Sequence, residues 1–164
     1  IEGNMTPSSV NQSLELSANF TDLGAHEGKA KPLSGGTSIR LHPRTIEAET
    51  FSSHKGPQIF DGEGIKFVGA INHSHWIEYP GFRIKDCKTF TVRYASGGAG
   101  AKITLTANGK KVAVAEIKPT GGWDKWEEIT APLRDLPDEL VDLRLTFTNP
   151  GKQHLANLDW IHFK

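Results

Sequence analysis

Two glutamates stand one residue apart in the segment IEAET (residues 46–50), where their carboxylates could bind a metal ion. If this segment is a strand, Glu47 and Glu49 point to one side, while Ile46 and Ala48 point to the core. Like charges placed side by side repel each other unless a cation lies between them. Calcium binds carboxylate and carbonyl oxygens, so this pattern is typical of part of a calcium site. The alternative is a pair of solvated glutamates on an exposed strand.

Two tryptophans lie three residues apart in TGGWDKW (residues 120–126), behind a pair of glycines. The glycines permit a sharp turn and keep other side chains away from its surface. An indole left in water at such a turn offers a rigid apolar platform, on which the C–H face of a sugar ring can stack. The alternative is that Trp123 and Trp126 both lie in the core, because aromatic side chains dominate core burial.

Other patterns that resemble catalytic or metal-binding motifs are incomplete. His73 and His75 have the spacing of metal ligands on a strand, but no third ligand is evident. The segment GGAGAK (97–102) lacks the Gly-Lys-Ser/Thr ending of a phosphate loop and is predicted to be a hairpin turn. No Ser/His/Asp order or nucleophile elbow is present. Paired carboxylates for glycoside hydrolysis would need a cleft.

The elements that must position these residues are short strands. Apolar residues alternate with polar ones, which predicts strands with one face in a core, and Asn108-Gly109 is a strong hairpin signal. Many short strands separated by glycine-rich turns predict an all-β fold, a β-sandwich of jelly-roll type. Trp76 and Trp160 lie inside alternating segments and are predicted to be core residues. The inward residues of the three clearest strands are predicted to be Phe90, Val92, Tyr94, Ile103, Leu105, Ala107, Leu143, Leu145 and Phe147.

Composition limits the possible functions. The chain has 164 residues, enough for one domain with a core, and its 19 basic and 19 acidic residues give no net charge. Binding to nucleic acid is therefore not expected. No apolar run reaches the roughly 20 residues of a membrane span, so no membrane partner is expected. Residues 1–20 contain no signal-peptide pattern, which leaves a mature or excised fragment of a secreted protein open.

The chain divides by composition near residue 43. Residues 1–43 are polar, rich in Ser, Asn and Gly, and patterned only at 13–19 and 37–42. We interpret them as a linker or as the tail of a preceding domain, which could add a strand to the sandwich. Residues 44–164 contain the recurring alternation and form the predicted domain.

Five segments within residues 44–164 resemble a family 6 carbohydrate-binding module. They are IEAET, HWIEY (75–79), FTVRYASGGAGAKITL (90–105), TGGWDKW and NLDWIHF (157–163), in this order. The resemblance implies a jelly-roll β-sandwich, a structural calcium ion and a sugar site in the loops at one end of the sandwich. Such modules bind polysaccharides or oligosaccharides, do no chemistry and are usually attached to secreted enzymes that degrade polysaccharides.

The resemblance also implies roles for particular residues. Trp123 corresponds to the sugar platform, and Trp126 to a tryptophan that packs inward. Asn157, just before Leu-Asp-Trp, corresponds to a ligand contact, for which an amide is well suited because it both donates and accepts hydrogen bonds. The alternative is an Asn that caps a turn before the last strand. The calcium ligands correspond to Glu47, Glu49 and Asp159.

This sequence departs from the family at the second aromatic residue of the site. That register lands on Ala70, and Phe67 could substitute only if the loop bends differently. The sugar would then stack on one face only, or bind on the concave face of the sandwich. Basic residues expected to border the loop end, His73 among them, indicate an anionic sugar if they are not simply solvated.

These observations predict non-catalytic carbohydrate binding that anchors a parent secreted enzyme to a polysaccharide. The module is expected to be an extracellular monomer tethered to a catalytic domain. One alternative is a small glycan-active enzyme domain that uses carboxylates in a cleft. The other is a structural spacer of the same fold whose sugar site has decayed.

Overall fold

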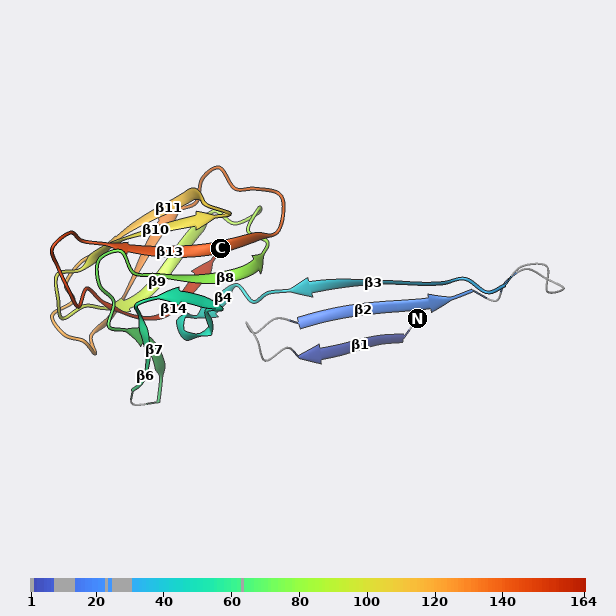
Figure 1. The fold of residues 1–164 in the computed structure, drawn as a ribbon, viewed down its shortest axis with the longest axis horizontal. Helices are drawn as coiled ribbons and strands as arrows, with labels where there is room; N and C mark the ends of the chain where they lie inside the picture. The colour runs from blue at the N-terminus through green and yellow to red at the C-terminus, as the bar shows by residue number, and fades with distance from the viewer. Residues whose placement is uncertain (1, 8–13, 23, 25–30, 63) are drawn as a thin grey trace. The chain divides into compact units, whose positions relative to one another are not determined.

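The computed structural model describes residues 2–7, 14–22, 24, 31–62 and 64–164, which fall into two compact units, Ile1–Pro43 and Arg44–Lys164. The first unit is a three-stranded antiparallel sheet in the order β1-β2-β3 (Figure 1). In the described part of the chain these strands pair only with one another. Their bounds are Glu2–Pro7 for β1, Leu14–Thr21 for β2 and Ser34–Leu41 for β3.

The second unit is a β-sandwich of two antiparallel sheets, as the sequence predicts. One sheet has the order β11-β10-β13-β8-β5, with bounds Lys110–Ile117, Ala101–Ala107, Val141–Thr148, Trp76–Phe82 and Ser53–Lys55. The other has the order β12-β9-β14-β7-β6, with bounds Trp126–Pro132, Thr89–Ala95, Asn157–Phe163, Lys66–Gly69 and Gln58–Asp61. The short strand β4 (Thr45–Glu47) also pairs with β14. Consecutive strands such as β8, β9 and β10 alternate between the sheets, which is jelly-roll connectivity.

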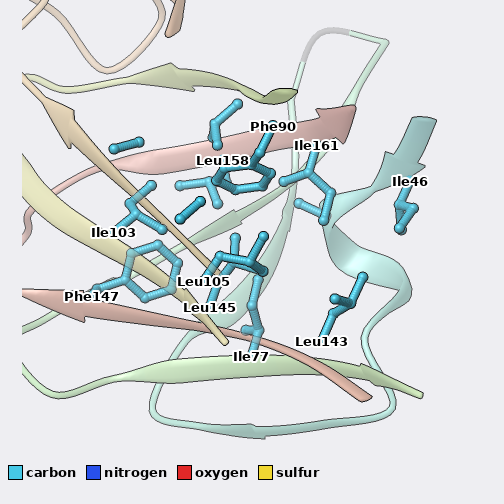
Figure 2. Packing of buried hydrophobic residues seen from close by; sticks show 14 of the residues in the cluster. Ile46, Ile77, Phe90, Ile103, Leu105, Leu143, Leu145, Phe147, Leu158 and Ile161 are labelled. Atoms are coloured by element: carbon cyan, nitrogen blue, oxygen red, sulfur yellow. The ribbon is translucent and has the colours of Figure 1, made fainter. Parts of the chain in front are cut away.

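The core lies between these two sheets and contains the side chains that the alternation predicts. Figure 2 shows Ile103, Leu105 and Phe147 of one sheet packed towards Phe90 and Leu158 of the other. Each of these five side chains is completely shielded from water. Burial of a side chain of this size contributes roughly 1.5–3 kcal/mol, so the two inner faces together supply the main stabilising term. The predicted inward residues of β9, β10 and β13 are all buried.

The predicted hairpin at Asn108-Gly109 is confirmed. These two residues connect β10 to β11, and both have positive φ values, +48° and +80°. Positive φ at both central residues is what a type I′ turn requires. The Asn108 side chain also accepts a hydrogen bond from the backbone N–H of Asp142, at 2.8 Å, which fixes this turn to the start of β13.

The prediction that Trp76 and Trp160 are core residues is wrong, because both are half-buried on the outer faces of the sheets. In β8, Ile77 and Tyr79 occupy the inward positions, and the Arg144 guanidinium lies 4.1 Å from the Trp76 ring centroid. In β14, an irregularity between Leu158 and Trp160 shifts the register. A bulge of this kind changes which side chains face inward. Alternation shows that a strand has two faces, but it does not show which face is buried.

No helix in the described part of the chain has the length and apolar character needed to cross a membrane.

Candidate functional site

A cleft of about 200 Å³ lies where several strands of the six-stranded sheet begin or end. Asn157, the first residue of β14, is paired with Ala95, the last residue of β9, and Ala95 is also paired with Trp126, the first residue of β12. These pairings place the loop before β12 and the end of β7 at the same end of the sandwich. The cleft is lined by Phe60, Phe67, Ala70, Trp123, His154, Ala156 and Asn157.

Trp123 is the most prominent exposed ring at this cleft, with 43% of its surface accessible to water. The indole lies against the glycine pair Gly97-Gly98 after β9. A Cβ atom at Gly97 would lie 2.7 Å from the indole Nε1, and one at Gly98 would lie 2.0 Å from the carbonyl oxygen of His154. Only residues without a side chain fit at these two positions. The glycine-rich segment that sequence analysis interpreted as a simple turn therefore also supports Trp123.

Asn157 is 9% exposed, and its amide is part of the cleft wall. Its Nδ2 donates a 3.0 Å hydrogen bond to the backbone carbonyl of Trp123. Its Oδ1 lies beside Gly69, where an added Cβ would be only 2.9 Å away. The structure thus brings together the two residues that sequence analysis assigned to sugar binding, although 34 positions separate them in the chain.

The lining of the cleft includes two phenylalanines from the β6–β7 hairpin. The Phe60 and Phe67 rings are stacked, with centroids 5.6 Å apart and planes at 17°. Phe60 is 40% exposed and reaches over Gly69, where a Cβ atom would lie 2.9 Å from its Cδ2. Ala70 follows with a φ of +52°, in the left-handed region that residues other than glycine rarely adopt. Phe60 of the neighbouring strand β6 thus brings an aromatic ring to the cleft that Ala70 also lines.

Phe67 was expected at the site from the sequence, whereas Phe60, which also lines the cleft, was not. The signal was present in QIFDGEGIKF (58–67), where two apolar runs flank a glycine-containing turn. A hairpin at this position pairs Phe60 with Phe67, which places both rings on one face of the sheet. The reach of Phe60 across Gly69 is a tertiary contact, and no local pattern indicates it.

The structure does not bring His73 into the cleft. Its Nδ1 accepts a 3.2 Å hydrogen bond from the backbone N–H of Asn149, and the Nδ1 of His75 accepts one of 3.1 Å from that of Asn72. Both histidines thus use a ring nitrogen to hold loops. His154 does line the cleft, and among the described lining residues it is the only basic one.

Trp126 does not pack inward as the resemblance implies, because β12 faces the core with Ala131 rather than with its tryptophan. Trp126 is half-buried on the outer face of the sheet. The Phe67 ring meets it edge-on at 5.8 Å, and the Arg93 guanidinium lies 5.4 Å from its centroid. Trp126 therefore supports the phenylalanine wall of the cleft from behind.

The three acidic residues assigned to calcium lie near one another, in a geometry that differs from the predicted strand. The strand ends at Glu47, and Ala48–Thr50 form one turn of 3₁₀ helix, so Glu49 is not on a continuous strand. Ile46 and Ala48 are buried as predicted. Asp159 of β14 is 4% exposed and forms an ion pair with Arg93.

The electrostatics show that these carboxylates interact. Burial raises the pKa of Glu47, and the charges of Glu49 and Asp159 raise it further. Burial also raises the pKa of Glu49, with Asp159 contributing in the same direction. In addition, Glu49 Oε2 is buried without a hydrogen-bond partner. A buried oxygen without a partner is costly, and a cation beside Glu47 and Glu49 would relieve both effects.

The same side chains do not form a complete metal cage. Within the described ranges, no group of three or more His, Cys, Asp or Glu side chains is arranged so that it could hold a metal ion. Arg93 occupies the Oδ2 of Asp159, which leaves the other oxygen of this carboxylate for a cation. Calcium takes six to eight oxygen ligands, so backbone carbonyls or water would have to supply the remainder.

A family model described as carbohydrate binding module (family 6) matches residues 47–164. Among curated proteins, a cycloisomaltooligosaccharide glucanotransferase from Niallia circulans is 34% identical over 76 residues, 45% of this chain and 8% of that protein. The clotting factor G alpha subunit of Tachypleus tridentatus is 26% identical over 98 residues, 56% of this chain and 15% of that protein. The chain therefore spans a small part of the length of both relatives.

Solved structures share the fold. A β-1,3-glucan-binding family 6 module from Bacillus halodurans has a TM-score of 0.65 and 27% identity, covering 73% of this chain and 94% of its own. A family 6 module from Clostridium cellulolyticum in complex with xylose has a TM-score of 0.67 and 25% identity, covering 73% and 95%. A family 43 arabinoxylan arabinofuranohydrolase from Bacillus subtilis, in complex with cellotetraose, has a TM-score of 0.68 and 18% identity, covering 99% and 40%.

Proposed function

Since the chain belongs to family 6 of the carbohydrate-binding modules, we propose that its cleft binds a neutral β-linked polysaccharide without cleaving it. The observation that carries this proposal is one cleft lined by the Trp123 indole and the stacked rings of Phe60 and Phe67, together with the Asn157 amide. Aromatic faces stack on the apolar C–H side of a pyranose ring, while an amide offers donors and an acceptor to its hydroxyls.

The composition of the cleft favours a neutral sugar. The described lining residues include no lysine, no arginine and no carboxylate, and His154 is the only ionisable side chain among them. An anionic or sulfated glycan would need cationic partners to replace its lost hydration. At about 200 Å³ the cleft is smaller than the roughly 300–1,000 Å³ of pockets that enclose drug-sized ligands. It therefore suits a short stretch of a glycan chain, with the remainder in solvent.

A β-1,3-glucan is the first ligand to test. The Bacillus halodurans module, 27% identical to this chain, is described as binding β-1,3-glucan. The Clostridium cellulolyticum module was solved with xylose, which makes xylan the second ligand of the panel. Both are neutral and β-linked, in agreement with the lining of this cleft.

The described lining residues include no carboxylate, which also argues against the enzyme alternative. Glycoside hydrolysis uses two carboxyl groups that flank the scissile bond, and the acidic residues Glu47, Glu49 and Asp159 are not among those that line the cleft. The aromatic lining argues against the spacer alternative, since a decayed site has no reason to keep exposed rings such as Trp123 and Phe60 in one cleft.

We also propose that Glu47, Glu49 and the free oxygen of Asp159 bind a structural calcium ion. The raised pKa values of the two glutamates and the unpartnered Oε2 of Glu49 support this assignment. When bound, the ion would neutralise the repulsion between β4 and β14. It would have no role in sugar chemistry.

The module is proposed to act as a monomer that anchors a catalytic domain of a secreted polysaccharide-active enzyme. Support comes from the relatives, which include a glucanotransferase and an arabinofuranohydrolase far longer than this chain. Binding through a small cleft raises the local concentration of substrate around a tethered catalytic site.

Affinity electrophoresis tests the sugar proposal. The protein is run through gels that contain a soluble β-1,3-glucan, a soluble xylan, a neutral α-glucan or a sulfated polysaccharide. Retardation by β-1,3-glucan or xylan, with no release of reducing sugar from either, is the expected result. Retardation only by the sulfated polymer would contradict the neutral cleft, and product release that survives repurification would contradict the binding-only role.

A further inference from the structure

The three-stranded sheet of residues 1–43 has one apolar face and one polar face. The register pairs Leu14 with Leu41 and Leu16 with Ile39, so these four side chains lie on the same face of β2 and β3. The opposite face contains the intervening residues, among them the paired Ser17 and Ser38. In an antiparallel sheet with this alternation, the polar face is normally solvated and the apolar face packs against a core.

Within the described part of residues 1–43, no second layer covers this apolar face. Phe20 is 63% exposed, Ile39 57% and Leu41 43%, and Leu33 just before β3 is 70% exposed. By contrast, among the described residues the buried hydrophobic core lies entirely between Ile46 and Phe163. Soluble proteins rarely expose several large apolar side chains side by side unless the surface is an interface.

The sheet is nevertheless well formed. The Phe20 ring crosses to the neighbouring strand and covers Gly35, where a Cβ atom would lie 2.6 Å from its Cζ. On the polar face, the hydroxyls of Thr21 and Ser34 are hydrogen-bonded at 2.7 Å. The hydrophobic face of a sheet is normally buried against a second layer of secondary structure, so the apolar face of this sheet calls for a partner.

The comparison with solved structures points to the second layer. Family 6 modules cover 73% of this chain, about the share that residues 44–164 make up. The family 43 arabinofuranohydrolase covers 99%, so the fold that it shares includes the three-stranded sheet. This chain covers only 40% of that enzyme. Most of that enzyme therefore lies outside the matched region, in the same polypeptide as a sheet of this kind.

We infer that the apolar face of β2 and β3 packs against a polysaccharide-cleaving catalytic domain of the same polypeptide. Phe20, Ile39 and Leu41 then belong to the hydrophobic core of that domain, and residues 1–43 are an integral layer of it rather than a flexible linker. The inference rests on the tethering part of the proposed function. It is independent of which sugar the cleft binds.

Hydrogen exchange of the complete polypeptide, compared with residues 1–164 alone, tests this inference. In the complete polypeptide the amides of β2 and β3 are expected to exchange at least tenfold more slowly, because a second layer covers them. Ile39→Glu should remove this protection and lower the melting temperature of the catalytic domain. The matched control is Ser38→Glu, which introduces the same charge one residue away on the polar face and should leave both quantities unchanged.

Two results would overturn the inference. Equal exchange rates in the two proteins would mean that the catalytic domain does not cover this face. Protection that depends on the concentration of residues 1–164, with a dimer in sedimentation, would assign the face to a second copy of the chain. Retardation in the polysaccharide gels is read separately, so failure of the sugar proposal does not affect this result.

Discussion

The Asn157 side chain donates a hydrogen bond of 3.0 Å to the backbone carbonyl of Trp123. This bond connects the first residue of β14 to the loop that precedes β12, and it makes the polar and aromatic parts of the cleft a single unit. Asn157 therefore has two roles in the proposed site: it offers polar atoms to the sugar and holds the loop that presents the indole.

Replacement of Asn157 by alanine should weaken both binding and folding. Loss of the sugar contact and of the fixed Trp123 loop is expected to reduce affinity more than tenfold, which is about 1.4 kcal/mol. Because Asn157 is 9% exposed and hydrogen-bonded, the free energy of unfolding should also fall by about 1 kcal/mol. Titration calorimetry and urea denaturation measure the two effects. A variant with weaker folding but unchanged affinity would show that Asn157 only caps the loop.

Replacement of Trp123 by alanine should affect binding and leave the fold almost intact. The side chain is 43% exposed, so its removal leaves no large buried cavity, whereas the stacking surface for the sugar disappears. We expect affinity for the best polysaccharide to fall by well over tenfold, with a change in melting temperature of a few degrees at most. The matched control is Trp76→Ala, which removes a half-buried indole from the other sheet. If only the Trp76 variant loses binding, the sugar site lies on that sheet face and not in the cleft.

Phe60 should contribute to binding as the second aromatic wall. Phe60→Ala removes the ring that is stacked on Phe67 and covers Gly69, and we expect a several-fold loss of affinity, corresponding to about 1 kcal/mol. The neighbouring Ile59 is 48% exposed and points to the opposite face of β6. Ile59→Ala is therefore the matched control and should bind like the unchanged protein. Equal affinity of both variants would leave Trp123 as the only aromatic wall.

The sequence predicted those parts of the fold in which local pattern and burial agree. Alternation located the inward faces of β9, β10 and β13 because apolar residues occupy only one of the two faces in each. It failed for Trp76 and Trp160, since β8 and β14 have large apolar residues on both faces and only packing against the opposite sheet decides between them. Trp123 and Asn157 were assigned to sugar binding through the family resemblance, and both line the same cleft in the structure. Phe60 was missed because its role depends on Gly69, a residue of another strand.

Replacement of Trp126 by alanine distinguishes the core position that the family resemblance implies from the half-buried position in the structure. As a core residue it would lose about 3–5 kcal/mol of stability on replacement by alanine. Its observed place, half-buried between Phe67 and Arg93 on the outer face of the sheet, predicts a loss of about 1–2 kcal/mol. Affinity should fall a few-fold, because Phe67 loses the ring that supports it. Phe90→Ala, which empties a fully buried position, is the reference in the same denaturation experiment. Equal losses for the two variants would restore the core interpretation.

The calcium proposal predicts opposite effects of one substitution in the presence and absence of metal. Calcium at 100 times its dissociation constant should add about 2.7 kcal/mol to the free energy of unfolding, and Glu49→Gln should abolish this gain. In chelator, burial and the charge of Asp159 keep the pKa of Glu49 above its ordinary value of 4.5. The folded state then holds the proton more tightly than the unfolded state, so stability falls as pH rises above 4.5. Metal-free Glu49→Gln should therefore melt higher than the metal-free unchanged protein at pH 7, and the difference should shrink towards pH 4.5. The melting temperatures of the wild-type protein and of the Glu49→Gln variant are measured at both pH values, with calcium and with chelator. If exhaustive metal removal does not change the melting temperature of the wild-type protein, the calcium site is rejected.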